Sequence, residues 1–351
     1  MKLFQCCHCA QRVFFENLHC ESCGSGLGFV PAEMEMVAFS NDEAWNRLGP
    51  PGRAQRRCSN YSLEGICNWT VDADDPAPLC ASCRTTEIIP ALSNPVNRAY
   101  WSRLEQAKRR LFYTLLGLGL RAPSREEDPH DGMAFRFLED AGQQTRVLTG
   151  HDAGTVTLNI AEADDAEREK TRTAMHEPYR SLLGHFRHES GHYYWDRLIA
   201  GTAWIDECRQ LFGDERLDYT EALRSHYASP SAVWSDSYIS AYASAHPWED
   251  WAECWAHYLH MVDGLETAHA WGLHLDHAVP AGDPLAVCPV DPNAASIEPS
   301  LIEQWLPLSQ FSNSMNRSLG LNDSYPFVVP PPVVSKLEFI HRVIGDAVRD
   351  R

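Results

Sequence analysis

The residues best suited to chemistry form the motif His188-Glu189-Ser190-Gly191-His192. On a helix, residues four apart return to within roughly 40° of one another, so both imidazoles can bind one metal ion. Glu189 lies beside such a site without being needed as a ligand, and it can act as the general base. Apolar side chains flank the motif and place its helix, expected from about Glu177 to Ile199, in a core: Leu182, Leu183, Phe186, Trp195 and Leu198. Buried imidazoles need a polar partner, which favours a metal.

A catalytic zinc usually has three protein ligands and one open position. The best source of the third ligand is a second helix that Pro247 begins and Gly264 can end, within which several acids and an imidazole share one face. We predict Glu253 as the ligand. Glu249, Asp250 and His257 could replace it as the ligand, or they could orient an imidazole.

Two cysteine sets predict structural zinc. Cys6, Cys9, Cys20 and Cys23 form two Cys-x-x-Cys pairs ten residues apart, which is the spacing of a four-thiolate site. A second set, whose first pair is wider, consists of Cys58, Cys67, Cys80 and Cys83. Four thiolates close the coordination sphere, so these ions would contribute to folding and not to catalysis. We therefore expect one catalytic and one or two structural zinc ions per chain.

With these motifs, the chain resembles a bacterial family of zinc-binding metallopeptidases that carries an N-terminal zinc ribbon. The resemblance rests on both cysteine sets, on the segment 177–196 and on the segment 246–253. More distantly the chain is similar to the Glu-zincins, whose downstream helix often reads Asn-Glu-x-x-x-Asp; here Ala252 precedes Glu253. That likeness implies that His246 stabilises the oxyanion, a role that Tyr238 or Tyr242 could also fill.

The distribution of cysteine predicts the domains, because nine of the 12 cysteines lie within the first 83 residues. We expect a zinc ribbon at 1–38, a second cysteine-rich segment at 39–92, a zincin-like catalytic domain at 93–290 and a completing helical segment at 291–351, where a short helix at 301–306 precedes the last one. The fold class is α+β: zinc-ribbon modules, then a mainly helical domain with a small β-sheet. The clean alternation of residues 155–160 predicts a strand, either at the sheet edge, where it could pair with substrate, or in the interior.

Charge and composition limit the partners. The chain has 351 residues with 44% hydrophobic residues, and 30 Lys and Arg against 48 Asp and Glu give a net charge of -18. This charge repels nucleic acid, and no apolar run approaches the roughly 18 residues that span a bilayer. We expect a cytoplasmic peptidase that hydrolyses peptide or protein substrates. The rival hypothesis is a non-enzymatic adaptor whose ribbons bind a protein partner and whose His-Glu-x-x-His metal is structural.

Overall fold

The computed structural model describes residues 1–140, 147, 149–175, 177–229, 233–275, 285–292, 294, 297 and 301–349. The chain forms two compact units. One unit comprises Lys2–Arg168, and the other comprises Glu169–Arg351 together with Met1. The division lies well beyond residue 92, where the cysteine-rich part of the sequence ends. The fold is α+β, as the sequence predicts.

The cysteine-rich part of Lys2–Arg168 is built from short antiparallel pairs. They are β1 (Phe4–Gln5) with β2 (Arg12–Val13), β3 (Gly26–Val30) with β4 (Glu35–Phe39), β4 with β5 (Arg47–Leu48), and β6 (Gln55–Arg57) with β7 (Thr70–Asp72). The short helix α1 (Ser59–Ser62) and the 3-10 turn η1 (Cys83–Thr85) lie at cysteines of the second set.

A four-stranded sheet follows in the same unit, in the order β10-β11-β9-β8. Its strands are β8 (Thr86–Ile88), β9 (Ala134–Leu138), β10 (Gly150–Asp152) and β11 (Thr155–Asn159). β11 pairs antiparallel with β10 and parallel with β9, and its Val156 and Leu158 are fully buried. The predicted strand is therefore interior, and the hypothesis that it forms the sheet edge is wrong.

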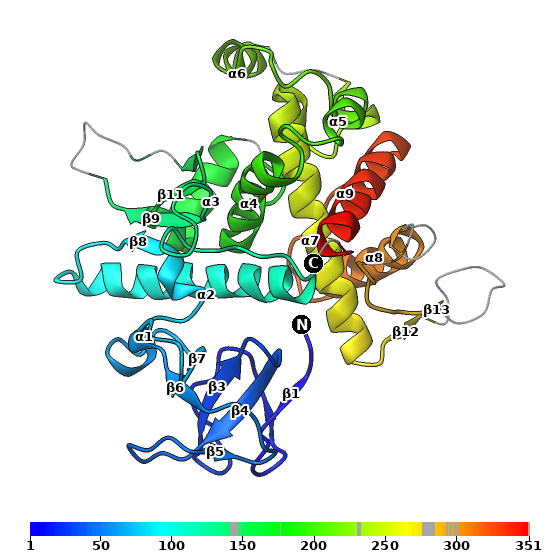
Figure 1. Ribbon diagram of the computed structural model, residues 1–351. Helices are drawn as coiled ribbons and strands as arrows, with labels where there is room; N and C mark the ends of the chain where they lie inside the picture. Colours follow the sequence, from blue (N-terminus) through cyan, green and yellow to red (C-terminus); the bar gives the residue numbers. More distant parts are fainter. Residues whose placement is uncertain are drawn as a thin grey trace. The chain divides into compact units, whose positions relative to one another are not determined.

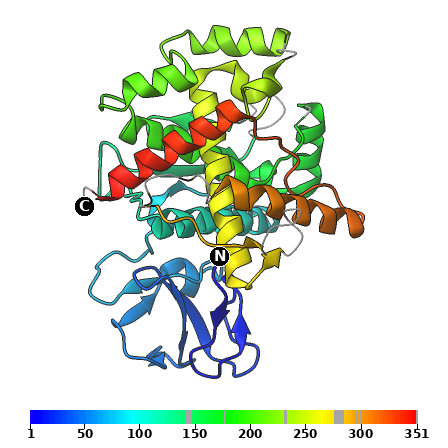
Figure 2. The same cartoon turned by 90° about the vertical axis from the view of Figure 1, so that its right-hand side faces the viewer.

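Helix α2 (Pro95–Gly117) lies between the short ribbon strands and this sheet (Figures 1 and 2). Asn94 caps it by accepting a hydrogen bond from the Val96 amide. On one side Tyr113 contacts the ring of Phe15, with centroids 5.4 Å apart, and on the other Phe112 contacts Phe135 at 6.3 Å. The 3-10 turn η2 (Ile160–Ala163) and helix α3 (Asp165–Ala174) follow the sheet.

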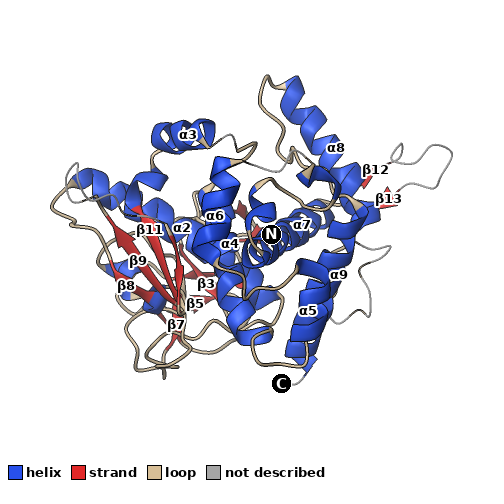
Figure 3. Ribbon diagram, turned by 90° about the horizontal axis from the view of Figure 1, so that it is seen from above, coloured by secondary structure: helices blue, strands red, loops and turns tan. Residues whose placement is uncertain are grey.

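The unit Glu169–Arg351 is helical around α7 (Pro247–Ala270), as Figure 3 shows. α7 contacts α4 (Leu182–Leu198), α5 (Ile205–Phe212), α8 (Ile302–Ser318), α9 (Pro331–Arg349) and the 3-10 turn η4 (Tyr242–Ala245). The unit also contains α6 (Tyr219–Ala228), η3 (Trp234–Asp236) and the strand pair β12 (His274–Leu275) with β13 (Leu285–Ala286). In the described part of the chain, no helix is both long and apolar enough to cross a membrane.

Three helix ends differ from the predictions. α4 begins at Leu182, five residues later than expected, because the Ser181 hydroxyl caps it by accepting from the Gly184 amide. α7 continues through Gly264, where a side chain would meet the Trp305 ring 2.6 Å away, so this glycine serves packing and does not end the helix. α8 continues through Pro307 to Ser318.

Candidate metal centres and active site

The site lies where α4 and α7 cross, and Gly191 allows the two helices to approach closely. A side chain at Gly191 would place its Cβ 2.8 Å from the Cα of Ala252, which is too close for any real contact. Two tryptophans of α7 fix the crossing with hydrogen bonds: Trp251 donates to the Gly191 carbonyl at 2.8 Å and Trp255 donates to the Ser190 hydroxyl at 3.1 Å. The crossing sets α4's imidazoles against α7's carboxylates.

Three possible metal ligands converge at this crossing. Single donor atoms of His188, His192 and Glu249 lie within 4.8 Å of one another. Glu249 Oε2 lies 3.0 Å from His188 Nε2 and 3.6 Å from His192 Nε2. Burial raises the pKa of Glu249, but the two imidazoles lower it by more, so the carboxylate is ionised. Two neutral nitrogens and one carboxylate oxygen form a typical catalytic zinc set.

The two oxygens of Glu249 have different surroundings. The hydroxyl of Tyr219 donates to Oε1 at 2.6 Å. Oε2 is buried, and the groups that face it are the ring nitrogens of His188 and His192. These nitrogens can donate to Oε2 only while they carry protons, and a cation between Oε2 and the two imidazoles would balance its charge when they are neutral. These residues therefore fit a zinc ion.

Glu253, the ligand predicted from the sequence, contacts the other side of the His188 ring. Its Oε1 lies 2.8 Å from His188 Nδ1, and its Oε2 accepts a hydrogen bond from the Ser240 hydroxyl at 2.7 Å. Both oxygens are thus engaged away from the atoms that Glu249 brings together. Burial lowers the pKa of His188, but Glu249 and Glu253 raise it by more.

Glu189 is buried beside the three converging residues. Burial raises the pKa of its carboxyl above the usual value, although the nearby imidazoles of His188 and His192 oppose the shift. Among the described residues, none donates a hydrogen bond to this carboxylate. A buried carboxylate with a raised pKa and no fixed partner has the properties of a general base.

His246 acts as the cap of α7. Its Nδ1 accepts from the Trp248 amide at 3.1 Å, and its Nε2 lies 3.1 Å from the Leu217 carbonyl, so both ring nitrogens are occupied. Of the two tyrosines considered with it, Tyr242 has its ring 5.9 Å from that of His188. The ring of Tyr238 instead contacts the Lys336 ammonium, which lies 4.4 Å from its centroid.

Asp250 and His257, which also lie on α7, have partners away from the converging ligands. Asp250 forms an ion pair with Lys336 at 2.6 Å. Burial raises the pKa of Asp250 to about 6, with Lys336 opposing the shift. His257 contacts the Tyr325 hydroxyl through Nδ1 at 2.7 Å, and burial lowers its pKa to about 4. Glu249 and Glu253 are four residues apart and lie on one face of α7, so the sequence offers both acids, one as a ligand and the other as a partner of a ligand.

Both cysteine sets are gathered as their spacing predicts. In each set the four sulfurs lie within 4.8 Å of one another. The first set is partly open, since Cys9 is exposed, whereas all four cysteines of the second set are buried. Backbone amides donate to sulfurs of the second set, from Trp69 to Cys67 at 3.3 Å and from Cys80 to Cys58 at 3.3 Å. Such donors stabilise thiolates, and four thiolates around one point fit structural zinc.

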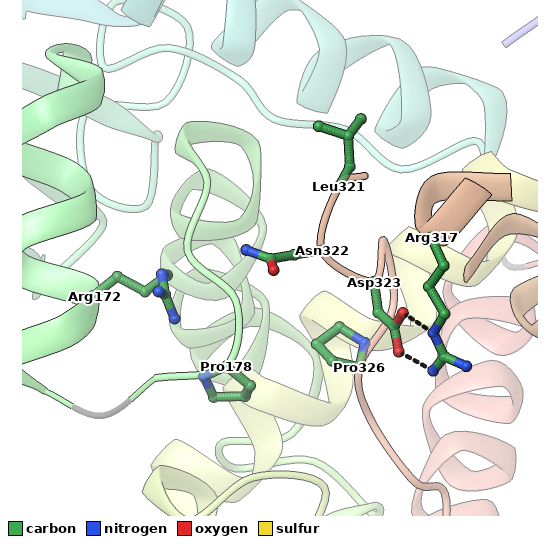
Figure 4. A pocket seen from close by; sticks show the side chains of 7 residues that line it. All are labelled: Arg172, Pro178, Arg317, Leu321, Asn322, Asp323 and Pro326. Atoms are coloured by element: carbon green, nitrogen blue, oxygen red, sulfur yellow. Dashed lines mark hydrogen bonds and ion pairs between the residues drawn. The ribbon is translucent and has the colours of Figure 1, made fainter. Parts of the chain in front are cut away.

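A hollow of about 450 Å³ lies in the unit Glu169–Arg351, and its lining residues contain no set of cysteines, histidines and acids that could bind a metal (Figure 4). Its two guanidinium groups are engaged: Arg172 by Glu169 and the Glu177 carbonyl, and Arg317 by both oxygens of Asp323. The lining consists of Arg172, Pro178, Arg317, Leu321, Asn322, Asp323 and Pro326. These lining residues offer no free charge to a ligand.

Comparison with known proteins gives two family matches. Residues 97–343 match the family described as "Putative zinc-binding metallo-peptidase", and residues 3–94 match a zinc-ribbon domain. Proteins described as uncharacterised, from Mycobacterium bovis and Mycobacterium tuberculosis, are 43% identical over 352 residues, covering 100% of this chain and 97% of theirs. No solved structure matches the chain.

Proposed function

The chain belongs to the family of zinc-binding metallopeptidases with an N-terminal zinc ribbon, and from this premise we propose that it is a zinc-dependent peptidase whose metal is held by His188, His192 and Glu249. The observation that carries the proposal is the convergence of two imidazole Nε2 atoms on one buried carboxylate oxygen. Zinc bound there would polarise a substrate carbonyl and acidify a water molecule.

Glu253 is proposed as a positioning residue. Its contact with His188 Nδ1 holds the proton on that nitrogen and leaves Nε2 free to bind the metal. The Ser240 hydroxyl in turn fixes the second oxygen of Glu253. With Glu249 as ligand, Glu249-x-x-x-Glu253 has the same spacing as the Glu-x-x-x-Asp part of the Glu-zincin pattern, with Trp248 in the place of the Asn.

Glu189 is proposed as the general base. It would take a proton from the attacking water and deliver it to the leaving amine, and the raised pKa of its carboxyl suits both transfers. Tyr242 is proposed as the donor to the developing charge on the substrate carbonyl oxygen. Burial and the charge of Glu249 raise its pKa, which keeps the hydroxyl protonated. His246 is left to cap α7 and so to fix the position of Glu249.

The decisive variant is Glu189→Gln, compared with Glu303→Gln at a position in the first turn of α8 away from the site. Hydrolysis of a random peptide library, followed by mass spectrometry of the new termini, should fall about 100- to 10,000-fold in Glu189→Gln. The zinc content should not change, and Glu303→Gln should be as active as the unmodified chain. Glu189→Gln that cleaves as well as Glu303→Gln contradicts the role of Glu189, and an unmodified, zinc-loaded chain that cleaves nothing contradicts the peptidase itself.

A further inference from the structure

Helix α2 buries three charged side chains within about one turn, in the unit that contains both cysteine sets. Glu105 and Lys108 are fully buried, and Arg109 is only 5% exposed. Charges are seldom buried without a partner, because the loss of hydration costs several kcal/mol per ion, as an order of magnitude. The charges around these three residues therefore have to balance.

Two of the three charges cancel each other. Lys108 Nζ lies 3.0 Å from Glu105 Oε2, and the Thr86 hydroxyl donates to Glu105 Oε1 at 2.7 Å. Lys108 Nζ also lies over the ring of Phe135, 5.2 Å from its centroid. This pair is neutral and leaves the positive charge of Arg109 uncompensated.

Among the described residues, no carboxylate forms an ion pair with Arg109 alone. No described group accepts a hydrogen bond from its buried Nη1, and the neighbouring Glu105 is already engaged by Lys108 and Thr86. The second cysteine set lies near this part of α2, because Thr86 directly follows η1, which begins at Cys83, and is hydrogen-bonded to Glu105, one turn before Arg109. Burial lowers the pKa of Arg109, but Cys67 and Cys83, followed by Glu105 and Cys80, raise it by more.

We propose that Arg109 is the buried counter-charge of the Cys58, Cys67, Cys80 and Cys83 zinc centre. One Zn²⁺ and four thiolates carry a net charge of -2, which a neutral interior tolerates poorly. The single positive charge of Arg109 offsets half of it, and the centre in turn supplies the anion that Arg109 lacks. The first centre has less need of such a cation, because Cys9 is exposed and water screens its charge.

The chain path makes this pairing a folding link between the two parts that match different families. The turn η1, which starts at Cys83, leads directly into β8, and β8 pairs parallel with β9. Thr86, the first residue of β8, is hydrogen-bonded to Glu105 on α2. The zinc-ribbon match thus supplies a strand to the sheet that lies in the metallopeptidase match. Zinc in the second centre, α2 and the sheet therefore fold together, and the ribbon is not a detachable module.

The test compares Arg109→Met and Arg109→Lys with Arg110→Met. Arg110 is the matched control, since it is the next residue of α2 but is 44% exposed and paired with Glu16. Zinc transfer to the chromogenic chelator 4-(2-pyridylazo)resorcinol is followed and counted per chain. Arg109→Met should release one zinc equivalent about tenfold faster than the unmodified chain, as expected for loss of a partner outside the ligand shell. Arg109→Lys and Arg110→Met should stay close to the unmodified chain, and Arg109→Met releasing zinc no faster than Arg110→Met would overturn the proposal.

A second measurement does not depend on an Arg109 variant. Cys80→Ser removes one ligand of the second centre, and amide hydrogen exchange is then followed along α2 and α9. Amides of α2 around Arg109 should exchange at least roughly tenfold faster, while those of α9 should not change. Unchanged protection of α2 in a chain that has lost this zinc would show that the centre and the helix fold independently. Neither experiment requires peptidase activity, so both stand apart from the proposed function.

Discussion

The two kinds of metal centre differ in how many ligands the chain supplies. Each cysteine set brings four sulfurs together, whereas the set found at the crossing of α4 and α7 among the described residues consists of two imidazoles and one carboxylate. A four-ligand centre can stabilise a fold but cannot bind substrate, and a three-ligand centre can do both. On the proposed assignment, the number of ligands separates the structural metal sites from the catalytic one.

The two kinds of centre also differ in how their charge is balanced. At the α4–α7 crossing, Zn²⁺ with one carboxylate would carry a net charge of +1, and the acids beside it, Glu189 and Glu253, oppose that charge. In the second cysteine centre the excess would be negative, and the proposed counter-charge is a buried cation, Arg109. On these assignments, the surroundings of the α4–α7 site and of the second cysteine centre each have the sign opposite to that of the centre.

Removing one ligand from each centre should give the largest difference in zinc affinity and folding between the two kinds of centre. Glu249→Ala should lower zinc affinity at the catalytic site by more than about 100-fold, because even partners outside the ligand shell contribute 10- to 100-fold. The Glu249→Ala variant should remain folded, since the tryptophans of α7 hold this helix in the core. Cys80→Ser should instead unfold part of Lys2–Arg168, where zinc contributes to folding. Zinc content by mass spectrometry and circular dichroism measure the two outcomes.

The comparison would fail if the two variants behaved alike. Glu249→Ala that unfolds on losing its zinc would mean that the α4–α7 centre is structural. A Cys80→Ser variant with unchanged zinc content and unchanged melting temperature would contradict the assignment of a zinc centre to the second cysteine set.

A smaller effect should follow from Gly191→Ala. Its Cβ would meet the Ala252 backbone at 2.8 Å, so α4 and α7 must separate, at a cost of about 1–3 kcal/mol in the free energy of unfolding. A shift of about 1 Å between Glu249 and the imidazoles should lower the rate of hydrolysis about 100-fold. Denaturant unfolding and peptide hydrolysis measure the two effects.

Gly117→Ala at the end of α2 is the control, since its nearest neighbour is a methionine methyl group 3.7 Å away. It should be neutral or slightly stabilising. Equal effects of the two glycine variants would show that the close approach at Gly191 does not set the site.

The features of the fold and of the site that depend on local spacing could be predicted from the sequence. The cysteine sets, the two imidazoles four residues apart and the α+β class depend on neighbouring residues or on periodicity. The choice between Glu249 and Glu253 could not be predicted, because both acids lie on the same face of α7, one turn apart, and only the crossing with α4 decides which nitrogen of His188 each one faces.

Long-range packing explains the other differences. Gly264 is of a residue type that often ends helices, but here it packs against Trp305 of α8. The role proposed for Arg109 could not be predicted from the sequence, since the pattern of α2 does not show that this arginine is buried. The sheet likewise includes β8, which the sequence assigns to the cysteine-rich part.

The most direct test of the central claim is anomalous diffraction at the zinc edge from crystals of the zinc-loaded chain. The peak should be bound by His188 Nε2, His192 Nε2 and a Glu249 oxygen, with a fourth position open to solvent and Glu253 hydrogen-bonded to His188 Nδ1. A peak bound by Glu253 in place of Glu249, or no peak between α4 and α7, would contradict that claim.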